Sequence, residues 1–111
     1  MTDCVFCKII ARIVPAQIKA ETDDILVIQD IAPKARVHYL IIPKKHIQDL
    51  NAFGPGDCCL AGKMVKMAQK LSQETSGAQD FKFIINNGYN AGQRVFHVHA
   101  HFLAGEHLPE F

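Results

Sequence analysis

His97-Val98-His99-Ala100-His101, followed by Phe102 and Leu103, is the stretch that decides the fold of this chain. Successive side chains of a β-strand point to opposite faces, so the three histidines are expected to share one face, about 7 Å apart. The alternate residues are apolar and predict a strand packed on a core: Phe96, Val98, Ala100, Phe102. Half of the six histidines of the chain lie in these five residues, which favours a chemical role over a structural one.

Three histidines on one strand face allow two kinds of chemistry. Imidazole nitrogens bind metal ions, and a neutral imidazole serves as a nucleophile or acid–base group near pH 7. The remaining alternative is an exposed strand that happens to be rich in histidine. The apolar alternation behind the histidines argues against that alternative.

The loop just before the histidines, Asn87–Arg94, is rich in asparagine and glycine. Such a loop is often only a turn. However, Gly92 and its neighbours can direct backbone N–H groups at an anion, and Gln93 and Arg94 add side-chain donors. Its position directly before three histidines favours a phosphate or oxyanion site.

Length and composition predict one globular domain spanning residues 1–111, with 49% hydrophobic and 21% charged residues. A net charge of +1 predicts no strong attraction to nucleic acid or anionic lipid. No apolar run approaches the about 20 residues that span a bilayer, and the first residues lack the pattern of a signal peptide. We therefore expect a cytoplasmic protein whose four cysteines are thiols or metal ligands.

The order of elements predicts an α+β fold, a five-stranded antiparallel sheet with two helices. Asp3 is expected to cap a short first helix that ends before Pro15. Asp57 is expected to cap a long second helix that runs to Ser76. Strands are predicted at 17–21, 25–29, 37–42, 81–86 and 95–103.

The long helix has an apolar arc of about 160° at 100° per residue, wider than the about 100° that packing on one core requires. This width allows for a subunit contact in addition to the core. The residues of the arc are Leu60, Ala61, Met64, Val65, Met67, Ala68 and Leu71.

Taken together, several motifs resemble the histidine triad (HIT) family over nearly the whole chain, from Cys4 to Gly105. These motifs are Asp30–Pro33, His38 with Ile41–His46, Asn86–Gly88 and Gly92–Leu103. The most similar branch is that of the nucleotide-binding nucleoside phosphoramidases. The resemblance implies a HIT-like fold whose sheet extends across a homodimer.

In that family the middle histidine attacks the α-phosphorus of a nucleotide and forms a nucleotidyl-histidine, which water hydrolyses. The resemblance assigns this role to His99. It makes His101 a partner of the phosphate oxygens or of the leaving amine, and it places His38 in the same site. In isolation, His38 is equally compatible with a surface histidine that heads a strand.

The resemblance also implies the nucleotide contacts. Asp30 corresponds to the residue that accepts both ribose hydroxyls, although alone it would be compatible with a simple turn. The residues of the implied base pocket, which are also compatible with ordinary core positions, are Phe6, Ile9, Ile28 and Ile31. The implied phosphate contacts are Asn86, Gln93 and the backbone of Gly92–Arg94.

Cys4 and Cys7 have the spacing of half a zinc site on one helix face. Some relatives with this motif resemble structural zinc binders that use histidines equivalent to His46 and His97. No cofactor is implied for the chemistry itself. The alternative is that Cys4 and Cys7 are ordinary buried thiols, which is what we expect of Cys58 and Cys59.

Three functions are compatible with the sequence. The favoured function is a purine nucleoside phosphoramidase acting on AMP- or GMP-like conjugates, and the others are a dinucleoside polyphosphate hydrolase and a non-catalytic nucleotide-binding module. Two departures from the phosphoramidase branch concern the leaving group: Arg94 replaces a smaller or acidic polar residue, and the tail ends at Glu110-Phe111 without a tryptophan.

Overall fold

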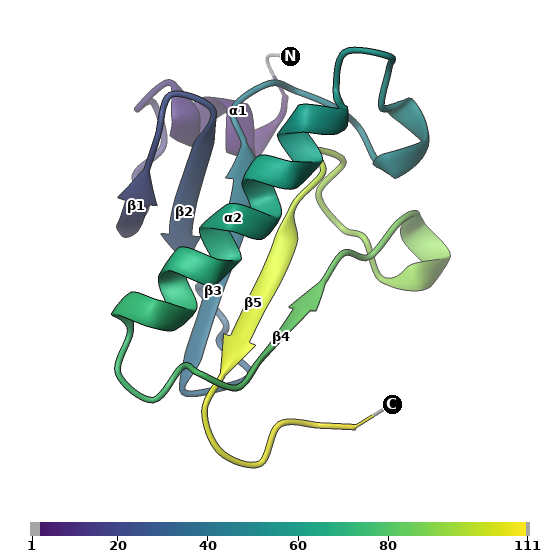
Figure 1. Ribbon diagram of the computed structural model, residues 1–111. Helices are drawn as coiled ribbons and strands as arrows, with labels where there is room; N and C mark the ends of the chain where they lie inside the picture. Colours follow the sequence, from purple (N-terminus) through teal and green to yellow (C-terminus); the bar gives the residue numbers. More distant parts are fainter. Residues whose placement is uncertain (1–2, 111) are drawn as a thin grey trace.

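Five antiparallel strands form one sheet in the order β1-β2-β3-β5-β4 (Figure 1). This architecture comes from a computed structural model that describes residues 3–110. The strands are β1 Ile18–Glu21, β2 Ile25–Gln29, β3 Val37–Pro43, β4 Phe81–Ile84 and β5 Ala100–Ala104. The helices are α1 Val5–Ile10 and α2 Cys58–Glu74, with short 3-10 turns η1 Leu50–Ala52 and η2 Tyr89–Ala91. The predicted α+β fold with five antiparallel strands and two helices is confirmed.

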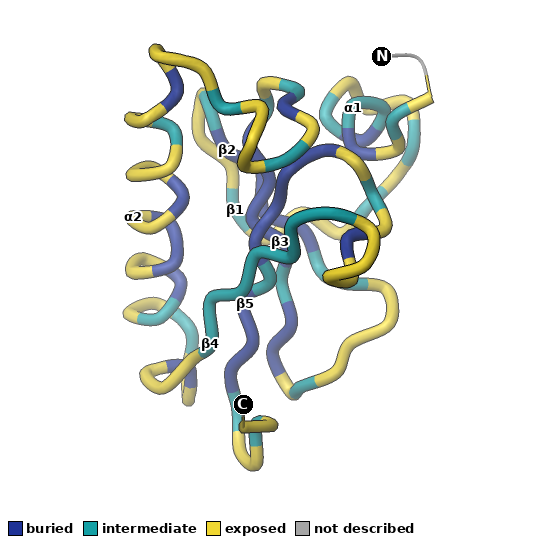
Figure 2. The backbone as a smooth tube through the Cα atoms, turned by 90° about the vertical axis from the view of Figure 1, so that its right-hand side faces the viewer, coloured by how far each residue is buried: buried dark blue, intermediate teal, exposed yellow. Residues whose placement is uncertain are grey.

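The two helices cover opposite faces of the sheet. Figure 2 shows α2 on one side of the strands and α1 on the other, with the buried backbone between them. The α2 side is packed around Ile25, Val27, Ile41 and Phe102. The α1 side is packed by Phe6 and Ile9 with strand residues of alternate register: Leu26, Ile28, Leu40, Ile42. This alternation is that of a sheet buried on both faces.

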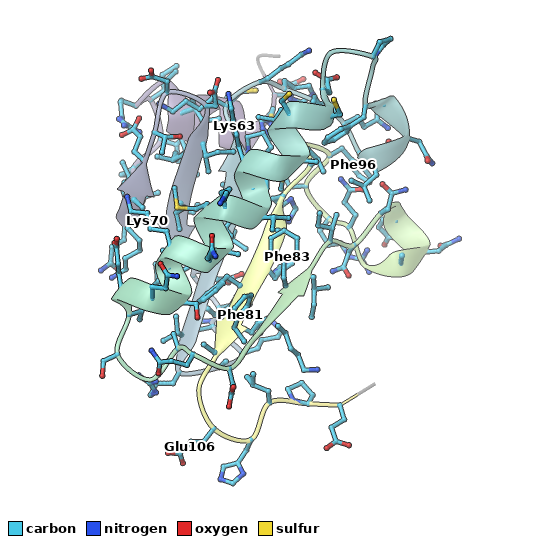
Figure 3. All side chains as sticks on the ribbon, viewed as in Figure 1. Lys63, Lys70, Phe81, Phe83, Phe96 and Glu106 are labelled. Atoms are coloured by element: carbon cyan, nitrogen blue, oxygen red, sulfur yellow. The ribbon has the colours of Figure 1, made fainter. Side chains whose placement is uncertain are left out.

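Only part of the apolar arc of α2 packs on the core, as its width of about 160° allowed. Only Met64, Met67, Ala68 and Leu71 are buried, while Ala61 is exposed and Val65 is 58% exposed. Figure 3 labels Lys63 and Lys70, two lysines of this helix. None of the helices within residues 3–110 has the length and apolarity needed to cross a membrane.

The histidine-rich stretch is only partly a strand, which corrects the predicted span of 95–103. β5 begins at Ala100, opposite Ile41, because β3 ends at Pro43 and proline offers no N–H to extend the ladder. Val98 instead donates its N–H to the carbonyl of Ile47 at 2.7 Å. Phe96, labelled in Figure 3, is 42% exposed and does not belong to the inner face as expected.

Other boundary predictions also need correction. Cys4, not Asp3, is the N-cap of α1, and its Sγ accepts the N–H of Cys7 at 3.3 Å. Asp57 precedes α2 but makes no side-chain cap bond, because its carboxylate accepts from Gly54 and Lys45. β4 ends at Ile84 rather than at residue 86.

The two cysteines at the start of α2 were expected to be buried thiols. Cys58 and Cys59 are both exposed. They occupy the first turn of the helix on the side away from the sheet, where no core reaches them.

Candidate active site and metal cluster

The sheet register places His38 and His101 beside each other on the α1 side. His38 is opposite Leu103, and His101 is opposite Leu40, so the two histidines are diagonal neighbours on one face. His38 Nε2 lies 2.9 Å from His101 Nδ1. His38 is only 2% exposed, which excludes the interpretation as a surface histidine.

The backbone fixes which nitrogen of each ring carries the proton. The N–H of Lys34 donates to His38 Nδ1 at 3.0 Å, so the proton of a neutral His38 must be on Nε2. That Nε2–H donates to His101 Nδ1, which leaves the proton of His101 on Nε2. The carboxylate of Asp30, whose Oδ2 lies 3.3 Å from His38 Nε2, also attracts the His38 proton. His101 therefore offers an N–H donor to a ligand.

His99 has the opposite arrangement. Its Nδ1 donates to the backbone carbonyl of His97 at 2.8 Å, so the lone pair of the neutral ring is on Nε2. The ring is 9% exposed, and the ring of Phe6 packs edge-on against it at 5.0 Å between centroids. The centroids of His99 and His101 are 5.2 Å apart, closer than the spacing of about 7 Å expected for an ideal strand.

All these rings are held in the neutral form by burial. Burial lowers the pKa of His38 and of His99. For His101, burial together with the neighbouring His99 and His38 lowers the pKa to about 4. At neutral pH the site therefore presents one unprotonated nucleophilic nitrogen and one N–H donor on adjacent rings.

A second cluster lies where the first triad histidine meets α1. His97 Nδ1 is 3.4 Å from Cys4 Sγ, 3.6 Å from Cys7 Sγ and 3.1 Å from His46 Nδ1. Cys7 Sγ is 3.3 Å from His46 Nδ1, and all four ligand atoms lie within 4.8 Å of one another. The structure thus brings together the four residues that the resemblance implied as zinc ligands.

The cluster fits a tetrahedral zinc ion. With Zn–S near 2.3 Å and Zn–N near 2.0–2.1 Å, ligand atoms around zinc are about 3.3–3.8 Å apart, close to the distances found here. His97 Nε2–H donates to the carbonyl of Pro43 at 2.7 Å, which leaves the Nδ1 lone pair for a metal. Burial and the adjacent Cys4 raise the pKa of the Cys7 thiol, and a cation is the group that would reverse this effect.

The loop before the triad uses many of its own donors. Gln93 is 1% exposed; its Nε2 donates to the carbonyls of Gln48 and Val95, and its Oε1 accepts from Gly88. Both amide hydrogens are then in use, so Gln93 braces the loop. Its contact with phosphate remains a prediction.

Two further residues of this loop were expected to bind phosphate. Gly92 has φ +102°, and a Cβ there would lie 3.4 Å from Nδ2 of Asn86, so these two residues are neighbours. Arg94 stacks on the ring of Tyr89 at 4.1 Å and donates from Nη1 to the carbonyls of Tyr89 and Gln93. These bonds use two of the five N–H donors of a guanidinium.

The residues of the implied base pocket differ in exposure. Phe6, Ile9 and Ile28 are 4–7% exposed, so each is also a core residue. Ile31, in contrast, is 101% exposed. It follows Asp30, whose Oδ1 accepts the N–H of Ala32 at 2.7 Å, so an uncovered apolar side chain lies next to the implied ribose ligand.

The sequence did not indicate the groups that determine which nitrogen of each histidine ring carries the proton. These are the N–H of Lys34 and the carbonyls of Pro43 and His97. They are backbone groups, so no side-chain pattern could have indicated them. Asn87, whose Oδ1 accepts the N–H of Leu50 at 2.6 Å, was visible only as part of an asparagine- and glycine-rich loop.

Comparison with known proteins agrees with this geometry. A family model described as "Scavenger mRNA decapping enzyme C-term binding" matches residues 3–111. A HIT-like protein of Synechocystis is 42% identical over 103 residues, which are 93% of this chain and 90% of that protein. The chain belongs to the histidine triad family.

Two solved structures add to this assignment. A HIT family hydrolase from Legionella pneumophila superposes with a TM-score of 0.92 at 36% identity, covering 96% of each chain. A Zn-bound histidine triad family protein from Mycobacterium smegmatis superposes with a TM-score of 0.82 at 34% identity, covering 93% of this chain and 75% of that one.

Proposed function

We propose that this chain is a purine nucleoside phosphoramidase, a hydrolase that cleaves the bond at the α-phosphate of a nucleoside monophosphate conjugate through a covalent nucleotidyl-His99. The observation that carries the proposal is the bond from His99 Nδ1 to the carbonyl of His97, at 2.8 Å. It directs the lone pair to Nε2, which is the form an attacking imidazole requires.

In the first step, Nε2 of His99 forms a bond to phosphorus and the P–N bond to the leaving amine breaks. The amine departs after it takes up one proton from solvent, and the Nε2–H of His101, held by the tautomer of His38, donates a hydrogen bond to the phosphate oxygens or to the leaving nitrogen. Water then attacks phosphorus, the bond to His99 Nε2 breaks and returns the lone pair to the ring, the proton of the water is released to solvent, and the nucleoside monophosphate departs. A P–O bond at the same phosphorus would follow the same course.

The nucleotide contacts belong to the same proposal. Asp30 would accept the ribose hydroxyls, and the fully exposed Ile31 supplies apolar surface that a base could cover next to the edges of Phe6, Ile9 and Ile28. Asn86, Gly92 and Arg94 would face the phosphate. These roles are supported by a carboxylate and an uncovered apolar side chain that are adjacent in one loop.

We propose two further properties with this function. Cys4, Cys7, His46 and His97 hold one structural zinc ion, and the chemistry itself needs no cofactor. The chain forms a homodimer in the cytoplasm, without nucleic acid or membrane as a partner. The exposed Val65 on α2 and the edge strand β4 support a contact between copies.

The test is a turnover comparison of wild type and His99→Ala on fluorogenic adenosine and guanosine phosphoramidates and on a dinucleoside polyphosphate. We expect wild type to prefer a phosphoramidate and His99→Ala to lose hydrolysis while it still binds AMP in calorimetry. Preference for the dinucleoside polyphosphate would favour the alternative hydrolase. Binding without turnover of any of these substrates by wild type would favour a non-catalytic module. Turnover by His99→Ala within about tenfold of wild type would exclude His99 as the nucleophile.

A further inference from the structure

We infer that the Cys/His cluster (Cys4, Cys7, His46, His97) positions the nucleophile, with His97 and Phe6 as the positioning residues that link the two sites. The inference rests on the proposed role of His99. A zinc ion in this cluster would then do more than hold α1 in place. It would also set the orientation of the His99 ring, which it does not contact.

The first link is His97, which belongs to both sites. Its Nδ1 lies in the cluster, its Nε2–H is bound to Pro43, and its backbone carbonyl accepts the Nδ1–H of His99. The His97 side chain is completely buried. A metal ion on Nδ1 would therefore fix the residue whose carbonyl sets the tautomer and direction of His99.

The second link is Phe6, which lies between the two thiols in the sequence. Its ring contacts His97 at 5.8 Å and His99 at 5.0 Å between centroids, both edge-on. α1 has six residues, too few to be stable on its own. Its place depends on packing and on the attachment of Cys4 and Cys7, so loosening the cluster releases the ring that packs against His99.

The cluster is also reachable from solvent. A cavity of 480 Å³ is lined by Cys4 and His46, two of the four ligands, together with Asp3, Val5, Arg94, Val95 and Phe96. A chelator or a metal ion can reach the site without unfolding the sheet. The orientation of His99 should therefore respond to metal occupancy in the folded protein.

The experiment compares zinc-loaded protein with protein stripped by a chelator, using the imidazole ¹⁵N signals of His99 and steady-state kinetics. The zinc form should show one His99 tautomer with Nδ1 protonated. Stripping should give mixed or broadened ring signals and a kcat lower by about tenfold or more, with KM for the phosphoramidate changed by less than about threefold. Added zinc should restore both readouts.

Phe6→Leu tests the second link with the metal in place. It should retain zinc yet shift the His99 ring signals and lower kcat, whereas loss of a base contact alone would raise KM. The matched control is Ile10→Ala, which loosens the packing of the same helix at a residue outside both sites and should leave the His99 signals unchanged. Unchanged His99 signals in Phe6→Leu would remove Phe6 from the link.

The inference would be overturned by His99 ring signals and kcat that stay the same on stripping, or by the absence of zinc binding in the folded chain. Failure of the proposed function has a different result. In that case wild type prefers the dinucleoside polyphosphate or turns over none of the substrates, or His99→Ala remains active. The ring signals do not depend on turnover, so they still report whether metal occupancy moves His99.

Discussion

Within residues 3–110, two groups of metal-ligating side chains lie close together, and they differ in the groups that surround their ring nitrogens. The Cys/His cluster brings four ligand atoms within 4.8 Å, and Asp30, His38 and His101 bring three ligand atoms equally close. Proximity therefore does not separate a metal site from a catalytic one. The two groups are distinguished by the backbone group that binds the ring nitrogen facing away from the other ligand atoms, which is Nε2 in His97 and Nδ1 in His38.

In the Cys/His cluster, His97 donates its far N–H to the carbonyl of Pro43, so its lone pair faces the other ligands. In the second group, the far nitrogen of His38 accepts from the N–H of Lys34, so a proton is directed at His101 and Asp30. To bind a metal through Nε2, a neutral His38 would have to carry its proton on Nδ1. That N–H would then face the N–H of Lys34, and two donors repel each other. The same residue type thus directs a lone pair at the other possible ligands in one place and an N–H donor at its neighbours in the other.

The largest effect is expected from breaking the Cys/His cluster. Cys7→Ala should reduce zinc from one ion per chain to none and lower the free energy of unfolding by about 3 kcal/mol or more, because zinc binding is part of the folding free energy. Elemental analysis and denaturant unfolding measure these effects. The double variant Cys58→Ala/Cys59→Ala removes two exposed thiols and should stay within about 0.5 kcal/mol. Two zinc ions per wild-type chain would contradict the distinction between the groups.

His38→Leu tests the second group. Loss of the donor to His101 leaves the tautomer of that ring unfixed, and kcat should fall by about 10²-fold, the lower range for loss of one positioned hydrogen-bond donor to the reacting phosphate. Leu40→Ile, on the same strand and face, is the control and should stay near wild type. Unchanged kcat in His38→Leu, with His101 still in one tautomer by NMR, would show that the proton of His101 is fixed by some other group.

Stability should fall on acidification because His101 stays neutral in the folded protein. Its folded pKa is about 4, against an ordinary value near 6.5, so between these pH values the unfolded chain binds a proton that the folded chain does not. The free energy of unfolding should therefore decrease as pH drops through this window, by up to about 3 kcal/mol from this ring. In denaturant titrations, His101→Asn should flatten the dependence, and His107→Asn on the exposed tail should not. Equal slopes for wild type and His101→Asn would refute the burial effect.

The smallest effect is expected from Arg94→Ser. The guanidinium adds a positive charge to the loop before the triad, so its removal should weaken AMP binding by about three- to tenfold and less so at high salt. Lys66→Ser, a cation removed from the outer side of α2, controls for net charge. Equal AMP affinity of Arg94→Ser and wild type would place Arg94 outside the phosphate site.

The fold was largely predictable because its periodicities are clear. The continuous apolar run of Ile25–Gln29, typical of a strand buried on both faces, and the apolar spacing of α2 predicted the sheet and its long helix. The stretch His97–His101 was predicted as continuous strand because alternation in sequence cannot show the register that sets Ala100 opposite Ile41 and leaves the N–H of Val98 to the carbonyl of Ile47. The site was predictable as a set of side chains, since His38, His99 and His101 do meet.

The role of each ring could not be predicted from residue types. The proton positions depend on the N–H of Lys34 and the carbonyls of Pro43 and His97. Nearly every residue has such backbone groups, and only the fold determines which of them lie beside a histidine ring. The exposure of Cys58 and Cys59 was missed for a related reason. Whether a cysteine in the first turn of a helix is buried depends on whether the sheet extends beneath that turn, and the sequence of the helix does not show this.

The role of His99 is tested most directly by trapping the reaction of the zinc-loaded protein with an adenosine phosphoramidate. The reaction is quenched without acid, and the adduct is mapped by peptide mass spectrometry. The assignment of His99 as the nucleophile predicts one adenylyl group per active site, attached to His99 and absent from His99→Ala, with His97 and His101 unmodified. An adduct on His97 or His101 would contradict it, as would turnover in which water attacks directly and no adduct forms.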